Sequence, residues 1–402
     1  MTTSPVRSCR FRFVSVLFAT FALVACSSSA PSPARDGGDD GTTPDDLEPN
    51  DASVEDARAD ADEGDKASAD AAPDLPADRG TADAAPGAFG GIAGLEDLST
   101  IKPSAGCGKD PGQPLGSWQT APAGANKYMF GYALNTPVTP KGSFTRRYFV
   151  KLPKSYDRDK PYRVVFQAPK CGAVGYEVPD FDAIATADAA DVAHGAGVIQ
   201  VGLTPDPAVW MAGCFDQQAG KDSIEGAFVE ALWPAVASAF CVDEHRVFMS
   251  GYDSGAWLAN QLGHVYGSRL FRAIATSGGG LVTGAALQPC LPVGLPGSST
   301  ALGGCLPSPG LWWHDAADAV DPFTGTKQAI EAALVANRCT NATFTAGPKV
   351  PYATLQHATC VSYSTCPAAF PVVLCTASQQ EHKNLLDDAA NLMTTWAFLR
   401  SF

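Results

Sequence analysis

The sequence predicts an α/β fold in which a mainly parallel central sheet has helices on both faces. From residue 144 onward, short apolar runs typical of strands alternate with longer segments of helical spacing. One run, residues 162–168, is almost continuously apolar, as expected for a strand buried on both faces of a parallel sheet. A glycine-flanked turn at residues 251–255 joins another apolar run directly to a helix. These three observations favour one large domain of alternating strands and helices.

The first 25 residues have the pattern of an export signal. Three arginines precede an apolar run over residues 13–25, which is too short to span a bilayer and suits the apolar region of a signal peptide. The run ends in Leu-Val-Ala-Cys, which resembles a bacterial lipobox and implies lipid attachment at Cys26. We therefore expect a lipoprotein of the bacterial outer membrane or cell surface, whose only membrane contact is the anchor. If the cysteine is incidental, we expect an extracellular protein.

Residues 26–103 are expected to form a disordered tether between this anchor and a folded body at residues 104–402. The segment 27–86 consists largely of Ala, Asp, Pro, Gly and Ser, so it cannot bury enough apolar surface to offset its ordering entropy. Asp and Glu outnumber Lys and Arg there by seventeen to four, which accounts for most of the net charge of −14. Because the body is nearly neutral, we expect no nucleic-acid partner.

Ten of the 12 cysteines lie in the expected body. An even number of cysteines in an exported protein predicts up to five disulfides, each worth about 2–4 kcal/mol. No Cys-x-x-Cys pair or His-rich spacing points to a bound metal. The acidic segment from His314 to Asp321 lacks the ligand spacing of a calcium loop. We expect a disulfide-bonded protein with no metal and no cofactor.

The body can be divided into elements in chain order. Strands are expected at residues 144–152, 162–168, 197–203, 246–249, 271–276, 311–314 and 371–376. Helices are expected at residues 180–194, 223–240, 256–267, 326–337 and 385–399. Pro234 should interrupt or kink the second helix, because proline has no N–H to donate and clashes with the preceding turn. Residues 281–309, rich in Gly, Pro and Leu, should form a disulfide-pinned loop over the functional site.

The turn Gly251-Tyr252-Asp253-Ser254-Gly255 is the expected centre of that site. Strand, sharp turn and helix is the arrangement in which an α/β-hydrolase holds its nucleophile, between glycines because a Cβ there would collide with the neighbouring strand and helix. The usual pattern is Gly-x-Ser-x-Gly, and Asp253 occupies the nucleophile position here. The chain order nucleophile, acid, histidine then points to Asp318 and His382, each of which follows a late strand.

Together these segments resemble secreted feruloyl esterases and polyhydroxybutyrate depolymerase-like esterases. The likeness covers most of residues 146–402, including the stretches at 146–166, 214–228 and 241–255 and the Trp-Trp-His-Asp-Ala-Ala-Asp segment at 312–318. The resemblance implies an α/β-hydrolase with Asp253, Asp318 and His382 in the positions of a catalytic triad. It also implies a small-molecule or polymeric ester as the substrate.

Two departures from the family pattern affect the chemistry. The family usually has Ser at the position of Asp253, and His-Gly at the position of Pro169-Lys170. Two backbone N–H groups normally activate the substrate carbonyl. One belongs to the residue after the nucleophile, here Ser254, and the other to the turn that contains Lys170 and Cys171. Pro169 itself has no N–H to donate.

An aspartate cannot simply replace serine in ester hydrolysis. A carboxylate that adds to an ester carbonyl gives an intermediate whose best leaving group is that same carboxylate, with a pKa of about 4, so the addition mostly reverses. At a saturated carbon with a good leaving group, the aspartate would instead form an alkyl-enzyme ester, which a His-activated water hydrolyses.

Three hypotheses remain open. The first is a hydrolase of the carboxylic-ester hydrolase clan, with Asp253 or a displaced Ser254 as nucleophile. The second is a non-catalytic, surface-tethered module that binds a polymer or an ester. The third is an Asp-nucleophile hydrolase that acts on alkyl electrophiles.

Overall fold

The computed structural model describes residues 98–112, 114, 118–119, 128–134, 144–187, 193–194, 196–205, 213–216, 223–281, 306–340, 343–378 and 381–402. The chain divides into two units, Met1–Ser68 and Ala69–Phe402, and every described residue belongs to the second. Cys26, most of the expected tether and residues 282–305 of the expected loop lie outside the described residues, so the predictions made for them stay predictions.

Among the described residues of the second unit, one mixed sheet of eleven strands forms the centre, in the order β1-β2-β3-β5-β4-β6-β7-β8-β11-β10-β9. Its strands are β1 (Trp118–Gln119), β2 (Tyr128–Leu134), β3 (Phe144–Lys151), β4 (Tyr162–Ala168), β5 (Ile199–Leu203), β6 (Val242–Tyr252), β7 (Ala273–Ser277), β8 (Gly310–Asp315), β9 (Lys349–Thr354), β10 (Ala358–Tyr363) and β11 (Val372–Ala377). The six strands from β5 to β11 in this order are parallel, and the strands at both edges are antiparallel. The predicted mainly parallel sheet is therefore confirmed.

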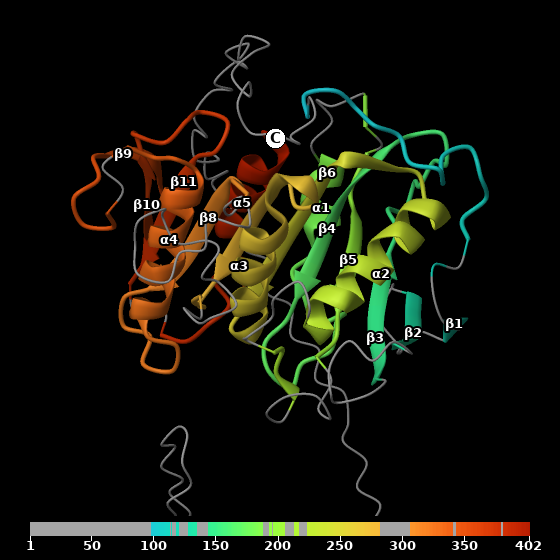
Figure 1. Ribbon diagram of the computed structural model, residues 1–402, viewed down its shortest axis with the longest axis horizontal. Helices are drawn as coiled ribbons and strands as arrows, with labels where there is room; N and C mark the ends of the chain where they lie inside the picture. Colours follow the sequence, from blue (N-terminus) through green and yellow to red (C-terminus); the bar gives the residue numbers. More distant parts are fainter. Residues whose placement is uncertain are drawn as a thin grey trace, which may run out of the picture. The chain divides into compact units, whose positions relative to one another are not determined.

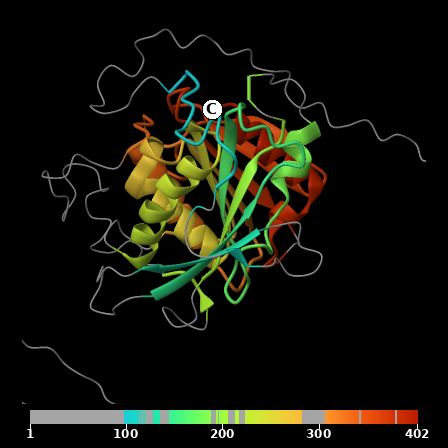
Figure 2. The same ribbon diagram turned by 90° about the vertical axis from the view of Figure 1, so that its right-hand side faces the viewer.

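Helices cover both faces of this sheet, as expected. They are α1 (Phe181–Ala187), α2 (Ile224–Ala239), α3 (Ser254–Tyr266), α4 (Phe323–Ala336) and α5 (Ala389–Arg400), with short 3-10 helices η2 (Gly267–Arg269) and η4 (Leu385–Asp387). Figure 1 shows α2, α3 and α4 in front of the sheet. In Figure 2, α5 lies on the opposite side of the sheet from α3. Two buried clusters match these layers, one containing side chains of α2, α3 and α4 and the other side chains of α1 and α5.

The register of the parallel strands brings their carboxyl ends to one edge of the sheet. At that edge Ala168 of β4 pairs with Gly251 of β6, and Tyr252 pairs with Ser277 at the end of β7. Likewise, Asp315 at the end of β8 pairs with Ala377 at the end of β11. Loops that follow these strands therefore start side by side, although they are far apart in the sequence.

Several predicted bounds change in the structure. The elbow strand β6 is longer than expected, because it begins at Val242. The described part of helix α1 reaches Ala187, and residues 193–194 of the expected helix form a bend. Of the two effects expected of Pro234, an interruption is wrong, because helix α2 continues through Pro234 to Ala239. Fully buried side chains on both sides of that proline, Leu232 and Val236, anchor the helix against the sheet.

Four disulfides join described cysteines, which confirms the disulfide-bonded fold. They are Cys107–Cys241, Cys171–Cys214, Cys339–Cys366 and Cys360–Cys375. Cys290 and Cys305 lie outside the described residues. The last of the four bridges crosses from β10 to β11, directly between paired residues.

Residues 98–103, which the sequence assigns to the tether, contact the body. The main-chain N–H of Lys102 donates to Asp243 at 2.9 Å, and Pro103 pairs with the same residue in an isolated bridge. Arg246 donates to the carbonyl of the buried Leu98 at 2.6 Å. The packed part of the chain therefore begins at least as early as Leu98.

No helix among the described residues combines the length and the apolar character that crossing a membrane requires.

Candidate active site

The elbow is a one-residue turn between β6 and α3. Asp253 has φ 53° and ψ −124°, a region that non-glycine residues seldom adopt and that costs about 1–3 kcal/mol. Main-chain hydrogen bonds hold Asp253 in this conformation. Its N–H donates to the carbonyl of Ser277, and its carbonyl accepts the N–H groups of Ala256 and Trp257. Asp253 thus stands between the end of a strand and the first turn of a helix.

The two glycines of the elbow are required by close backbone contacts. A Cβ on Gly251 would lie 2.1 Å from the carbonyl oxygen of Gly255 in α3. A Cβ on Gly255 would lie 1.9 Å from the carbonyl oxygen of Ala168 at the end of β4. Both distances are far below any real contact, so the collision with the helix and the neighbouring strand that the sequence predicts is confirmed.

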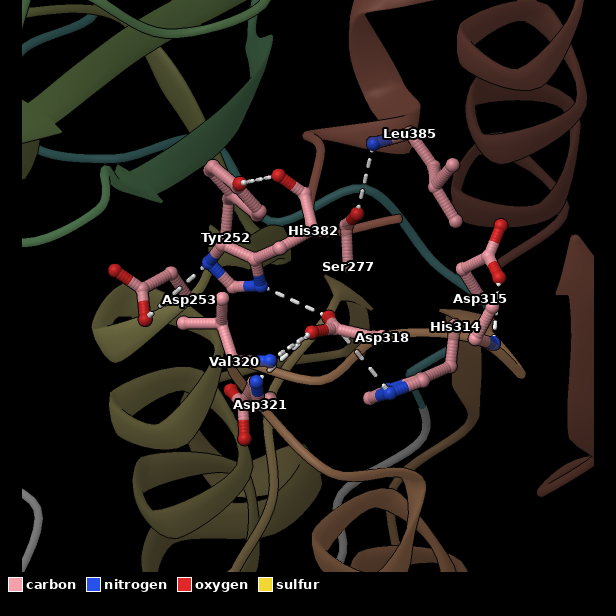
Figure 3. Close-up of polar contacts among 12 residues, drawn as sticks. Tyr252, Asp253, Ser277, His314, Asp315, Asp318, Val320, Asp321, His382 and Leu385 are labelled. Atoms are coloured by element: carbon pink, nitrogen blue, oxygen red, sulfur yellow. Dashed lines mark hydrogen bonds and ion pairs between the residues drawn. The ribbon is translucent and has the colours of Figure 1, made fainter. Parts of the chain in front are cut away.

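His382 lies between Asp253 and Asp318 (Figure 3). Its Nδ1 is 2.8 Å from Asp318 Oδ2, and its Nε2 is 4.0 Å from Asp253 Oδ1. A proton on Nδ1 satisfies the carboxylate of Asp318 and leaves the lone pair of Nε2 facing Asp253. The carbonyl of His382 accepts the Tyr252 hydroxyl at 3.3 Å, which ties the histidine loop to the elbow. The three residues predicted from the chain order are therefore brought together.

Asp318 is built to remain a carboxylate. Its Oδ1 accepts the main-chain N–H groups of Val320 and Asp321 at 2.9 and 2.8 Å, and its side chain is almost completely buried. Burial alone would raise the pKa of Asp318, but the N–H groups of Asp321 and Val320 together with His382 hold it below its usual value. An ionised Asp318 orients His382 through Nδ1, the role of the acid in a triad.

Cys171 supplies the main-chain donor that Pro169 cannot supply. Its N–H donates to Asp253 Oδ2 at 3.1 Å, and its side chain is fixed by the disulfide to Cys214. Lys170, the other residue predicted near this turn, is exposed to solvent. The two carboxylate oxygens of Asp253 therefore have different neighbours: one accepts the Cys171 N–H and the other faces His382.

Ser254 is placed where it cannot act as the nucleophile. It is completely buried in the first turn of α3, and its hydroxyl has no hydrogen-bond partner. The displaced-serine form of the first hypothesis is therefore contradicted by the geometry. Ser254 is, as expected, the residue that directly follows Asp253 in the chain.

Asp321 is a third carboxylate beside the site, and its role was missed at the sequence level. It is buried, and its Oδ2 accepts the Trp257 indole N–H at 2.8 Å. Burial, opposed by this hydrogen bond and reinforced by the charges of Asp253 and Asp318, raises its pKa to about 6. The only signal in the sequence was its spacing of three residues after Asp318.

His314 also borders Asp318, at 3.9 Å from Nε2 to Oδ2. Its Nδ1 lies 2.7 Å from the hydroxyl of Thr326, which itself donates to the carbonyl of Gly279. The hydroxyl can then only accept from His314, so Nδ1 holds the proton. Burial lowers the pKa of His314, although Asp318 acts against this. A neutral His314 therefore packs against Asp318 without forming an ion pair with it.

No group of three or more His, Cys, Asp or Glu side chains in the described ranges is arranged to hold a metal ion. Trp312 and Trp313 are buried core residues, whereas Trp257 borders the site.

No family model matches the chain. It is similar to feruloyl esterase D of Neurospora crassa, with 23% identity over 201 residues, which are 48% of this chain and 60% of the relative. It is also similar to feruloyl esterase C of Emericella nidulans, with 27% identity over 139 residues, 35% of this chain and 48% of the relative. The matched segments thus span about half of the length of these relatives.

Among solved structures, the acetyl xylan esterase of Aspergillus awamori matches with a TM-score of 0.48 and 12% identity, over 67% of this chain and 99% of that one. The ferulic acid esterase of Anaeromyces mucronatus matches with a TM-score of 0.38 and 12% identity, over 70% of this chain and 93% of that one. With both scores under 0.5, the fold assignment rests on the parallel sheet, the strained elbow and the chain order of the loops that meet there. The chain has the α/β-hydrolase fold and resembles feruloyl esterases in sequence over about half of its length.

Proposed function

We propose that this chain is an exported hydrolase of the carboxylic-ester hydrolase clan in which Asp253, in place of a serine, forms the covalent bond to the substrate. The observation that supports this proposal is that the two carboxylate oxygens of Asp253 face different groups. Oδ2 accepts the Cys171 N–H at 3.1 Å, while Oδ1 faces His382 Nε2 at 4.0 Å. One oxygen is thus free to attack, and the other is already placed against a hydrogen-bond donor.

The first step is a displacement at a saturated carbon. Asp253 Oδ1 forms a bond to that carbon, and the bond to the leaving group breaks with its electron pair. This gives an alkyl ester of Asp253 and the free anion. Attack at a carbonyl is disfavoured for two reasons. The carboxylate would be expelled again, and Asp253 itself uses the Cys171 donor that would otherwise activate the carbonyl.

The second step hydrolyses this ester. His382 Nε2 takes a proton from water while the hydroxyl oxygen adds to Cγ of Asp253, with Asp318 stabilising the imidazolium through Nδ1. Negative charge develops on Oδ2, which the Cys171 N–H already faces. The intermediate then expels the alcohol, which takes its proton from His382, and Asp253 is left as a carboxylic acid that releases its remaining proton to solvent to restore the carboxylate.

The proposed substrate class follows from the resemblance and from this chemistry together. The similarity to feruloyl esterases supports a small-molecule or polymeric ester, which would be attacked at its alkyl carbon and would release its carboxylate. Alkyl halides have better leaving groups and serve as diagnostic substrates for the same site. Hydrolysis of either class yields an alcohol.

The test is to trap the alkyl-enzyme. His382→Ala should leave the first step intact and block the second, so intact-mass spectrometry after exposure to 1-bromohexane should show one added hexyl group, located on Asp253 by peptide mapping. Asp253→Asn with the same histidine substitution is the matched control and should remain unmodified. In water labelled with ¹⁸O, a single turnover of the wild type should place the label in Asp253 and leave the hexanol unlabelled.

A non-catalytic module that binds a polymer or an ester is the second candidate. It is favoured by the same contact, because in this protein the activating donor is used by Asp253 itself. The trapping experiment separates the two. A folded His382→Ala protein that stays unmodified with 1-bromohexane and with benzyl bromide would leave the binding module as the function.

We also propose that residues 1–25 are a lipoprotein signal, that Cys26 carries the lipid, and that an acidic tether connects it to the catalytic body. The four disulfides among the described residues support an oxidising compartment outside the cytoplasm. The contacts of residues 98–103 with β6 support an end of the tether before Leu98. Cys26→Ser should abolish labelling by a radioactive fatty acid, whereas persistent labelling would exclude this anchor.

A further inference from the structure

Tyr252 joins the elbow to the histidine loop through two contacts (Figure 3). Its hydroxyl donates to the carbonyl of His382 at 3.3 Å, and its ring centroid lies 5.4 Å from that of the imidazole at an interplanar angle of 32°. Among the described residues, no other hydrogen bond involves the main chain of His382. Because Tyr252 directly precedes Asp253, the two contacts fix His382 relative to the elbow residue itself.

The two carboxylates on either side of His382 make its exact position important. Nδ1 is 2.8 Å from Asp318 Oδ2, whereas Nε2 is 4.0 Å from Asp253 Oδ1. Hydrogen bonds between a charged donor and a carboxylate are about 2.7–2.9 Å long, so the second distance is too long for one. The attraction between an imidazolium and a carboxylate grows as their separation falls. A His382 that took up a proton from solvent would therefore be drawn toward Asp253 and would bridge both carboxylates.

Such a bridge would stop both steps of the proposed reaction. Asp253 Oδ1 would be engaged by a proton and could not attack carbon, and Nε2 of His382 could not take a proton from water. Close packing does not prevent the approach. The side chains of His382 and Asp253 are 18% and 20% exposed, and His382 borders a cavity of about 710 Å³. The separation of the two groups therefore depends on the contacts that hold the histidine loop.

We propose that Tyr252 is a positioning residue that keeps His382 Nε2 out of hydrogen-bond reach of Asp253 Oδ1. The hydroxyl holds the carbonyl of His382, and the ring limits the tilt of the imidazole. Burial, reinforced by the charge of Asp253, raises the pKa of the Tyr252 hydroxyl above its usual value, so it stays a donor. The expected effect on rates rests on the proposed function, whereas the separation of the two atoms does not.

Tyr252→Phe tests this proposal, because it removes the hydroxyl and keeps the ring. With protein in excess over 1-bromohexane, bromide release reports the first step, and it should be roughly 10- to 100-fold slower in the variant, the range expected for one hydrogen bond to a charged group. In a His382→Ala background, the same substitution should leave the rate of hexyl addition unchanged, since no imidazole remains to pair with Asp253. Equal slowing in both backgrounds would indicate a general disturbance of the elbow and would overturn the proposal.

Tyr363→Phe is the matched control, because the hydroxyl of Tyr363 also donates to a carbonyl, that of Phe344, at 3.2 Å. It should release bromide at the wild-type rate, and slowing as large as that of Tyr252→Phe would also refute the proposed role.

A crystal structure of Tyr252→Phe gives a readout that does not depend on activity. His382 Nε2 and Asp253 Oδ1 should approach to about 2.7–2.9 Å. A separation that stays near 4.0 Å would overturn the positioning role, whether or not the protein is an enzyme. A shortened separation in a protein that is never alkylated would support the positioning role and exclude the proposed hydrolase.

Discussion

The main-chain N–H of Cys171 donates to Asp253 Oδ2, and this contact joins two residues that are 82 positions apart. It places a carboxylate oxygen against the kind of donor that stabilises developing negative charge in acyl transfer. The same contact disfavours a carbonyl substrate in the unmodified protein and favours hydrolysis of an ester formed on Asp253 itself. The chemistry of the site therefore depends on how firmly the Cys171 turn is held.

The disulfide to Cys214 should be the main restraint on that turn. Cys171→Ser/Cys214→Ser and Cys339→Ser/Cys366→Ser should each lose about 2–4 kcal/mol of unfolding free energy, measured by guanidinium denaturation. Only the first pair should also slow hydrolysis of the alkyl-enzyme, by at least tenfold, because a missing donor of this kind costs on the order of 10²–10³ in rate. An equal kinetic loss in both pairs would mean that the bridge does not position the donor.

The raised pKa of Asp321 predicts a specific dependence of stability on pH. Its folded-state pKa is about 6 against an ordinary value of 3.8, so between these values the native state binds more protons than the unfolded state. The contribution of Asp321 to stability therefore falls as the pH rises from about 4 to about 6. At pH 7 the loss should amount to about 3 kcal/mol.

Asp321→Asn should remove this loss, since the amide oxygen can still accept the Trp257 N–H. The variant should match the wild type below pH 4 and be more stable at pH 7 and above, as measured by denaturant titrations at each pH. Taking the difference between the two proteins cancels the titration of groups that do not interact with Asp321, such as the buried His264. Asp159→Asn, an exposed position in the turn before β4, should show no such pH-dependent gain.

Much of the active-site constellation could be predicted because local rules and sheet geometry decide it. The glycines at 251 and 255 predict the elbow, since any Cβ there meets backbone atoms. Asp318 and His382 follow parallel strands whose carboxyl ends share one edge, so their chain order is enough to bring them to Asp253. These predictions needed no knowledge of long-range side-chain contacts.

The remaining features depend on contacts that no local pattern encodes. The Cys171 donor is set by the path of a turn that begins with Pro169, and the raised pKa of Asp321 by burial against Trp257. Strands β9 and β10 were missed because β9 is largely exposed and lacks an apolar run, and pairing with β11 defines this edge of the sheet.

Limited proteolysis of the full chain tests the domain boundary. The segment 27–86 contains four trypsin sites, the last after Arg79, and its composition predicts that it is cut first. The stable product should begin at Gly80 and keep residues 98–103, which are hydrogen-bonded to β6. N-terminal sequencing of that product is the measurement. Cleavage within the body at a similar rate would show that the boundary is misplaced.

Asp253→Ser should convert the site to a serine hydrolase. The substitution removes the carboxylate oxygen that accepts the Cys171 N–H, so the donor becomes available to a substrate carbonyl, and it places a hydroxyl at the elbow near His382. His382 and Asp318 are already arranged to remove the proton from that hydroxyl. We expect covalent labelling by a fluorophosphonate and measurable hydrolysis of 4-nitrophenyl acetate, both absent from Asp253→Ala.

The double variant Asp253→Ser/His382→Ala decides whether this activity comes from the triad. Loss of the general base should reduce labelling by about 10²–10⁴. Asp253→Ser/Ser254→Ala should label as well as Asp253→Ser, because the Ser254 hydroxyl is buried away from the site. Labelling of the wild type at Ser254 would show that the elbow register is wrong. A folded Asp253→Ser protein that neither labels nor turns over would contradict an intact triad and favour the binding module.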